Sequence, residues 1–371
     1  MTGPSMRSKA WAATATGHLG PAGVVTAHSD EQPRVEPAPP RGRVEREQLE
    51  DTTLQPAATR ARGAGERAVE EQPDDERTCF ERDRDRVLHS PAFRRLAGKT
   101  QVFVFPADHQ RTRLTHALEV NQVATSVARA TGLNVALTEA IAIGHDCGHG
   151  PGGHASEEAF DAFLPAGYDH AVWGADVVLT PLNLCVQTLD GIRNHSWSRP
   201  SPATPEGVVV SWADRIAYTA HDLEDAVHAG IVSPDDLPTE VAEVCGRTRG
   251  EQLRTFVTEL VECVSTTGVI GMRPEVAEAL AALRTFCYDR VYTRPEALAQ
   301  TAAVVAVLHA LVEHYVEHPS ALPVHTDDDP VRAAVTYVGG MTDRFAFRTA
   351  VADLGWSPER LPRGIDVRRR P

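Results

Sequence analysis

The stretch "IAIGHDCGHGPGGHASEEAF", residues 141–160, decides the fold of this chain. It places His145 next to Asp146 at the end of an apolar helical pattern, and a glycine-rich turn then leads to His154 and an acidic helix start. Consecutive side chains on a helix diverge by about 100°, so the pair cannot be buried together in one apolar stripe. We therefore expect this helix end to face a cleft, where both side chains bracket a metal ion.

Two further residues complete a candidate set of metal ligands. His116 opens the preceding helical pattern, and Asp214 lies within a long later one. A divalent cation held by imidazole and carboxylate groups needs three or four ligands that converge from different elements. Any one of these residues alone is better explained as a satisfied polar side chain. The ordered set of His116, His145, Asp146 and Asp214 favours a metal centre.

Helical periods dominate the chain. Segments 116–130, 206–230 and 295–318 repeat apolar residues at helical spacing. Strand patterns are rare, so we expect an all-α array with at most a short β-hairpin near 100–106. Residues 1–53 are rich in Pro, Gly, Ala and charge without an apolar period, and we expect them to be a disordered tail.

Composition narrows the class of protein. The chain has 371 residues, of which 42% are hydrophobic, and its net charge of −14 argues against a surface built mainly to bind nucleic acid. Six cysteines show no C-x-x-C pair, which favours reduced thiols. There is no uninterrupted apolar run of about 18 residues and no compact signal peptide, so we expect a soluble, cytoplasmic protein.

The long helical segment around Asp214 carries a second polar feature. Asp214, Tyr218 and Asp222 are spaced i, i+4 and i+8, so they form one line along a helix face. That line points in the same direction as the metal ligand. We expect Tyr218 and Asp222 to contact a substrate beyond the metal.

A series of motifs extends over about 270 residues and resembles the HD-superfamily deoxynucleoside triphosphate triphosphohydrolases, specifically the deoxyguanosinetriphosphate triphosphohydrolase-like group. A lone His-Asp pair would be a weak signal, but the ordered series is specific. The matching stretches are "FERDRDRVLHSPAFRRLAGKTQVF" (80–103), "RTRLTHALEV" (111–120), "EAIAIGHDCGHGPGGHASE" (139–157), "YDHAVWGADVV" (168–178), "LDGIRNHS" (189–196), "ADRIAYTAHDLEDA" (213–226) and "YVGGMTDRFA" (337–346).

The resemblance implies an HD-domain hydrolase that splits a dNTP, with dGTP favoured, into deoxynucleoside and inorganic triphosphate. It implies that a divalent metal on the four ligands directs water to the α-phosphorus. In such proteins the histidine matching His154 lies by the leaving oxygen, paired with the acid matching Glu157, and His170 is a further catalytic histidine. Residues three apart at a helix start are neighbours, which supports the pairing of His154 with Glu157.

The resemblance also implies substrate contacts for phosphate, deoxyribose and base. A planar guanidinium suits bidentate capture of phosphate oxygens. The substrate-binding residues that it implies are Gln101, Arg113, His149, Arg215, Tyr218 and Asp222.

We expect residues 54–371 to form the hydrolase, with a metal-binding core at about 110–230 and a C-terminal helical part at about 235–350. Histidine and aspartate ligands suit Mn²⁺ or Mg²⁺, and also iron, cobalt, nickel or zinc. Such proteins assemble as homo-oligomers, as hexamers or tetramers, and some bind single-stranded DNA. No patch in this acidic sequence identifies a DNA site.

Two departures from the family pattern and two alternatives remain. Relatives carry an aromatic residue where this chain has Gly152, which predicts a more mobile loop before His154. They carry Asn and Gln shortly after His170, where this chain has Ala171, Val172 and Trp173. The alternative functions are an HD phosphohydrolase for another nucleotide, of the 5′-nucleotidase or alarmone type, and a non-catalytic nucleotide sensor.

Overall fold

The computed structural model describes all residues except 1–2, 21–22, 31, 107–108, 324–326 and 364–371. The chain divides into two compact units, Met1–Arg41 and Gly42–Pro371. In the first unit, helix α1 (Met6–Ala13) is followed by an antiparallel pair, β1 (His18–Leu19) and β2 (Val25–Thr26), in which His18 pairs with Thr26. These strands form the only sheet in the described residues.

The second unit begins before residue 54, inside the stretch that we expected to be a disordered tail. Helix α2 (Arg43–Thr53) belongs to this unit. Its Glu50 accepts hydrogen bonds from the Ala61 backbone at 2.7 Å and from the Asn134 side chain at 3.0 Å. Composition alone does not reveal this anchoring of a charged helix by polar contacts, and the extent of the hydrolase domain stays a prediction. Disorder of residues 1–41 stays a prediction.

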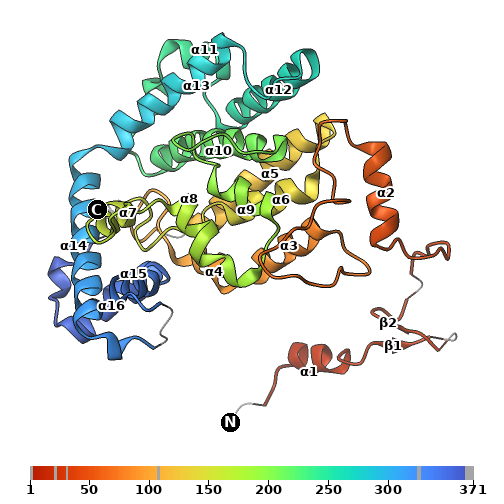
Figure 1. Ribbon diagram of the computed structural model, residues 1–371, viewed down its shortest axis with the longest axis horizontal. Coiled ribbons are helices and arrows are strands. Elements are labelled where there is room, and N and C mark those ends of the chain that lie inside the picture. The colour runs from red at the N-terminus through yellow and green to blue at the C-terminus, as the bar shows by residue number, and fades with distance from the viewer. Residues whose placement is uncertain (1–2, 21–22, 31, 107–108, 324–326, 364–371) are drawn as a thin grey trace. The chain divides into compact units, whose positions relative to one another are not determined.

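The main core lies around helix α10 (Pro205–His228), which runs through the middle of Figure 1 beside α5 (Arg113–Thr131) and α6 (Val135–Gly144). Local signals fix these helices: α5 ends at Gly132 in the left-handed region, and the Asn134 side chain caps α6. The remaining helices of this core are α3 (Cys79–His89), α9 (Val186–Arg193), α11 (Thr239–Cys245), α12 (Arg249–Thr267) and α13 (Pro274–Cys287).

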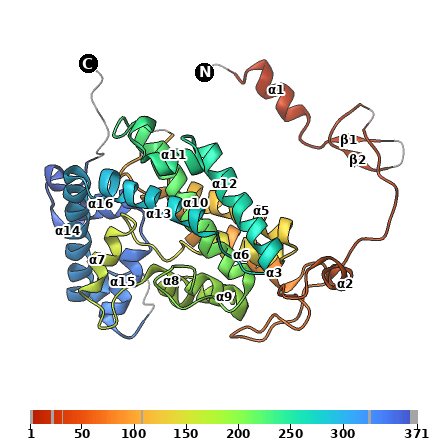
Figure 2. The same ribbon diagram turned by 90° about the horizontal axis from the view of Figure 1, so that it is seen from above.

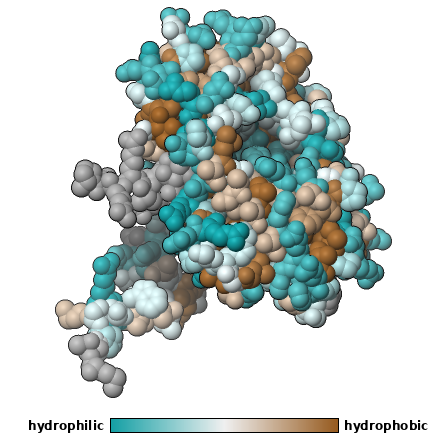
Figure 3. Space-filling view, turned by 90° about the vertical axis from the view of Figure 1, so that its left-hand side faces the viewer, coloured by the Kyte–Doolittle hydropathy of each residue, from teal (hydrophilic) through white to brown (hydrophobic). Residues whose placement is uncertain are grey.

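A second core is built on helix α14 (Pro295–Glu317). By length and composition alone α14 could cross a membrane, and it is the one such helix among the described residues. It packs against α7 (Ala155–Asp161), α15 (Pro330–Gly339) and α16 (Asp343–Leu354), and one of its faces, which includes Leu308 and Leu311, is buried there. The same packing is visible from above in Figure 2. On the face of the molecule shown in Figure 3, apolar and hydrophilic residues are intermixed.

The all-α expectation is confirmed, and the segment at 100–106 contains no hairpin. It makes one isolated bridge, between Thr100 and Thr112, and is otherwise a series of bends. Further short elements of the chain are α4 (Pro91–Arg95), α8 (His170–Trp173) and the π-helical turn at Gly174–Val178. All six cysteines are free, and four of them are buried.

Candidate active site

Three helices bring the four expected metal ligands together. His116 stands in the first turn of α5, His145 and Asp146 follow α6, and Asp214 lies on α10. His116 Nε2 is 3.1 Å from Asp214 Oδ1, and His145 Nε2 is 3.7 Å from the same oxygen and 3.5 Å from Asp146 Oδ1. The sequence prediction that these side chains converge therefore holds in the structure.

The chemistry of this donor set fits a divalent cation. His145 donates its Nδ1 hydrogen to the Ala142 carbonyl at 2.7 Å, which leaves a buried Nε2 without a partner. Burial lowers the pKa of His145, so the ring stays neutral, as a ligand must. Burial would raise the pKa of Asp146, but Arg113 and the neighbouring histidines together outweigh this effect and hold that pKa well below the usual range. The site therefore offers a neutral imidazole beside an ionised carboxylate.

Arg113 connects the ligand cluster with the open pocket. Its Nη1 donates to Asp146 Oδ2 at 2.8 Å, while its buried Nε and Nη2 have no partner. Gly153 makes this approach possible, because a Cβ there would lie 2.6 Å from Arg113 Nη2. Two unpartnered guanidinium donors at a pocket wall are suited to phosphate oxygens.

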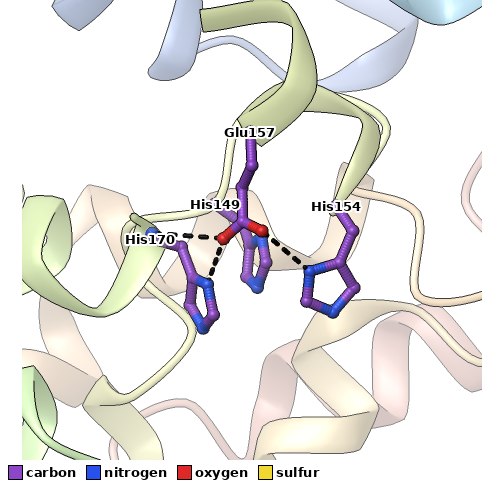
Figure 4. A group of neighbouring side chains, drawn as sticks. All are labelled: His149, His154, Glu157 and His170. Carbon is purple, nitrogen blue, oxygen red and sulfur yellow. Dashed lines mark hydrogen bonds and ion pairs between the residues drawn. The ribbon is translucent and has the colours of Figure 1, made fainter. Parts of the chain in front are cut away.

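Glu157 lies between two histidines, as Figure 4 shows. Its Oε2 bonds His154 Nδ1 at 3.2 Å, and its Oε1 bonds both the backbone N–H and Nδ1 of His170. Burial would raise the pKa of Glu157, but these bonds to His154 and His170 lower it far below its usual range. The expected pairing of residues 154 and 157 is present, and His170 joins it from α8.

His149 lies behind this pair in Figure 4 and stacks on His170, with ring centroids 3.7 Å apart. Its Nε2 is 3.2 Å from Asp146 Oδ1. Burial and then the charge of Arg113 lower the pKa of His149, so the ring is neutral. The backbone carbonyl of His149 accepts a hydrogen bond from Lys99, which is buried outside the pocket rather than lining it.

The loop before His154 is anchored through its backbone. Gly152 adopts φ +76°, and a Cβ there would lie 2.4 Å from Val304 Cγ1. Its N–H donates to Asp343 Oδ1 at 2.8 Å, and Oδ2 of the same carboxylate accepts from Thr100. The loop before His154 is thus tied to the "MTD" segment at the start of α16.

Gly148 allows the turn after Asp146 to lie close to the segment that carries His170. A Cβ at this position would lie 2.0 Å from the carbonyl oxygen of His170 and 2.5 Å from the nitrogen of Gly174. The turn after Asp146 and the segment carrying His170 therefore touch main chain to main chain. The Tyr168 hydroxyl donates to the Gly148 carbonyl at 2.6 Å and fastens the contact.

The polar line on α10 borders the same pocket, which has a volume of about 440 Å³. Tyr218 Oη accepts from Arg284 Nε at 2.8 Å. Asp222 accepts from Tyr292 Oη at 2.6 Å and also from Arg111. The other expected contacts also line the pocket, namely Gln101, Arg113, His149 and Arg215.

Several residues at the pocket carried no assignment from the sequence. The guanidinium of Arg215 lies over the Trp197 ring at 3.9 Å. His195, buried after α9, has its Nε2 3.2 Å from His170 Nε2. His195 belongs to the stretch "LDGIRNHS", which marked the region as part of the family pattern. Helical periodicity could not assign a role to the residue, because it lies just beyond the helix end.

Comparisons with known proteins agree with this geometry. The HD domain family matches residues 113–219, and the phosphohydrolase-associated domain matches residues 270–351. The first region contains the four ligands and the second contains α14 and Asp343.

Relatives named deoxyguanosinetriphosphate triphosphohydrolase-like proteins cover most of the chain. One from Caldanaerobacter subterraneus subsp. tengcongensis is 40% identical over 312 residues, which are 81% of this chain and 92% of the relative. One from Clostridium perfringens strain 13 is 39% identical over 74% of this chain and 86% of the relative. One from Deinococcus radiodurans is 36% identical over 84% of this chain and 99% of the relative. With its HD domain and its ligand cluster, the chain belongs to the deoxyguanosinetriphosphate triphosphohydrolase-like family of HD proteins.

Proposed function

We propose that this protein is a metal-dependent dNTP triphosphohydrolase that releases a deoxynucleoside and inorganic triphosphate, with dGTP as the favoured substrate. One observation carries the proposal: a single pocket is lined by the His116–Asp146–Asp214 cluster, by His154 and by Tyr218 of α10. Under this proposal the pocket would hold the metal ion, the proton donor and the sugar contact side by side. The names of the relatives support the substrate class.

At the phosphate end, the donors of this chain hold the substrate. When a divalent cation is bound, it lowers the pKa of water and neutralises charge that gathers on the phosphate. The unpartnered Nε and Nη2 of Arg113 would bind phosphate oxygens, with His149 and Arg215 beside them. Asp146 keeps Arg113 in place through its Oδ2.

At the leaving group, His154 would act as general acid. Its Nδ1 hydrogen is engaged by Glu157, so Nε2 is the nitrogen that can give a proton to the 5′ oxygen. The Glu157 carboxylate stays ionised because of its two histidine partners, and it holds the ring in the productive orientation. We assign His170 to the catalytic group through its bond to the same carboxylate.

At the sugar, Tyr218 would occupy the space that a 2′-hydroxyl needs, and Asp222 would accept from the 3′-hydroxyl. Asp222 is held in place by Tyr292, and the hydroxyl of Tyr218 is held by Arg284. Gln101, whose buried Oε1 has no partner, would contact the sugar or base. Discrimination between deoxyribose and ribose would thus rest on side chains that are already positioned before the substrate binds.

The coarser properties follow the same proposal. We propose residues 54–371 as the hydrolase, with the metal-binding core at about 110–230 and the helical part at about 235–350. We propose Mn²⁺ or Mg²⁺ as the native ion, a homo-oligomeric assembly and a cytoplasmic location. A binding site for single-stranded DNA is not proposed.

The test is product analysis with purified protein, Mn²⁺ and each dNTP in turn. Inorganic triphosphate and deoxynucleoside support the proposal, whereas pyrophosphate or orthophosphate would indicate another HD phosphohydrolase. No product with any metal would indicate a nucleotide sensor. Asp146→Ala should abolish turnover, while Asp353→Ala, at an exposed position on α16, should leave it unchanged. Full activity of Asp146→Ala would refute the metal centre.

A further inference from the structure

A buried arginine lies behind the sugar end of the pocket. Arg111 precedes α5, two residues before Arg113, and only 8% of its surface is exposed. It does not line the pocket, whereas its neighbour Asp222 does. Arg111 can therefore influence a bound substrate only through another side chain.

Three carboxylates share the guanidinium of Arg111. Its Nε donates to Asp225 Oδ2 at 3.0 Å, and its backbone N–H donates to the same oxygen at 3.3 Å. Its Nη1 donates to Glu119 Oε2 at 3.1 Å. Its Nη2 donates to Asp222 Oδ1. Because a planar guanidinium presents its donors in fixed directions, the bonds to the first two carboxylates also fix the direction of the bond to Asp222.

Asp222 is held through both of its oxygens. Oδ1 accepts from Arg111, and Oδ2 accepts from Tyr292 Oη at 2.6 Å. The two donors come from different parts of the chain, since Tyr292 ends the π-helical turn Tyr288–Tyr292 after α13. A carboxylate has about four lone-pair sites, so each oxygen can still accept another hydrogen bond. The two anchors therefore fix the directions in which Asp222 can accept from a ligand.

We propose that Arg111 is a positioning residue that makes the pocket select nucleotides with a 3′-hydroxyl. Together with Tyr292 it aims the open lone pairs of Asp222 at the sugar, without touching the substrate itself. A 3′-deoxy nucleotide leaves this buried acceptor unpaired, and sites of this kind reject an analogue that lacks the hydroxyl. The inference rests on the proposed function, in which Asp222 accepts from the 3′-hydroxyl, and it identifies the group that orients this acceptor.

The experiment compares kcat/KM for dGTP and for 2′,3′-dideoxyguanosine triphosphate, with the full-length protein and Mn²⁺. The quantity of interest is the ratio of the two values. We expect the wild type to prefer dGTP by at least about tenfold. Arg111→Lys keeps the positive charge but loses the planar fork, and we expect its ratio to fall by about tenfold. A purely structural role of Arg111 would lower kcat/KM for both nucleotides alike and leave the ratio unchanged.

The matched control is Arg249→Lys. Arg249 Nη1 also donates to a carboxylate of α10, that of Glu224 at 2.7 Å, but neither residue lines the pocket. The ratio should therefore keep its wild-type value in this variant. Arg249→Lys also shows whether the loss of any arginine–carboxylate pair on α10 alters the preference.

A second variant covers the case in which Arg111→Lys does not fold, as judged by circular dichroism. Tyr292→Phe removes only the hydroxyl that bonds Asp222 Oδ2 and leaves the buried charges in place. Its ratio should also fall. An unchanged ratio in a folded Arg111→Lys protein, or in Tyr292→Phe where that protein does not fold, would overturn the inference.

Failure of this inference and failure of the proposed function look different. A wild type that releases triphosphate equally well from both nucleotides would overturn the inference and leave the function standing. Release of no triphosphate from any dNTP would refute the function. The ratio is then taken from the dissociation constants of the two nucleotides, measured by calorimetry. A lower ratio in Arg111→Lys would support the inference there too, whereas an unchanged ratio or a wild type without preference would overturn it.

Discussion

The Asp343 carboxylate accepts the backbone N–H of Gly152 at 2.8 Å, across 191 residues of sequence. Through its other oxygen it also accepts from the backbone and hydroxyl of Thr100. Asp343→Ala would leave these buried donors unsatisfied, and we expect a loss of roughly 2–4 kcal/mol in the free energy of unfolding. We also expect kcat to fall at least about tenfold, because the loop carries His154.

Urea unfolding and steady-state kinetics with the favoured dNTP measure both effects. Asp353→Ala on the same helix is the matched control, and it should change neither quantity. A stable Asp343→Ala protein with normal kcat would show that the loop is held by other contacts.

Gly152→Ala should destabilise the protein through two separable effects. The positive φ of 76° strains any L-residue by about 1 kcal/mol, and the Cβ would also overlap Val304. Gly230→Ala shares a positive φ of 69° but meets nothing within 4 Å, so it measures the backbone strain alone. We expect the melting temperature to fall further for Gly152→Ala, and Val304→Ala to restore part of that difference. Equal losses in both glycine variants would contradict the overlap.

Lys99 gives stability a specific pH dependence. Burial, with the nearby charge of Arg95, lowers the pKa of Lys99 from 10.5 to about 7, although its ammonium donates to the Gly339 carbonyl at 3.0 Å. Between about pH 7 and pH 10.5 the unfolded chain binds more protons than the folded one, so this group makes stability rise with pH. Below about pH 7 both states are protonated, and the contribution is constant.

The measurement compares the free energy of unfolding of wild type and Lys99→Met from pH 6 to pH 9. The wild type should gain on the variant above pH 7, by at most about 1.4 kcal/mol per pH unit. Lys9→Met, at an exposed position on α1, should run parallel to the wild type. Parallel curves for Lys99→Met would show that the lysine titrates normally.

Tyr218 should control discrimination between deoxyribose and ribose. Under the proposed function its ring fills the space of a 2′-hydroxyl, so Tyr218→Ala should raise kcat/KM for a ribonucleotide relative to its dNTP by about tenfold or more. Tyr218→Phe keeps the ring and loses only the bond from Arg284, so it should keep most of the discrimination. If both variants remain equally selective, another side chain excludes ribose.

The sequence predicted the residues of the site better than it predicted their supports. His116, His145 and Asp214 were recoverable because a metal centre demands certain residue types in a certain order, and the helical periods around them are strong. Only one of the two histidine partners of Glu157 could be predicted from the sequence. Its pairing with His154 is local, whereas its bond to His170 depends on a loop closing between α7 and α8.

The hydrogen bonds that hold the site residues in place could not be predicted, because they join distant segments of the chain through backbone groups. Nothing in the pattern near Asp343 indicates a bond to Gly152, and nothing near Lys99 indicates bonds to the carbonyls of His149 and Gly339. The missing hairpin at 100–106 has the same origin. Alternating apolar residues there serve a pocket wall, with Gln101 and Phe103 facing the cavity, rather than a strand ladder.

The main-chain contact at Gly148 fixes a distance within the site. The turn after Asp146 rests directly on the backbone around His170, because Gly148 has a hydrogen atom where other residues have a Cβ. This close approach fixes the separation between the Asp146 segment and the His170 segment. Side-chain rotamers at the pocket rim can vary without altering that separation. In this chain the spacing between the turn after Asp146 and the segment of His170 is therefore a property of the main chain, whereas the pocket wall is built from side chains.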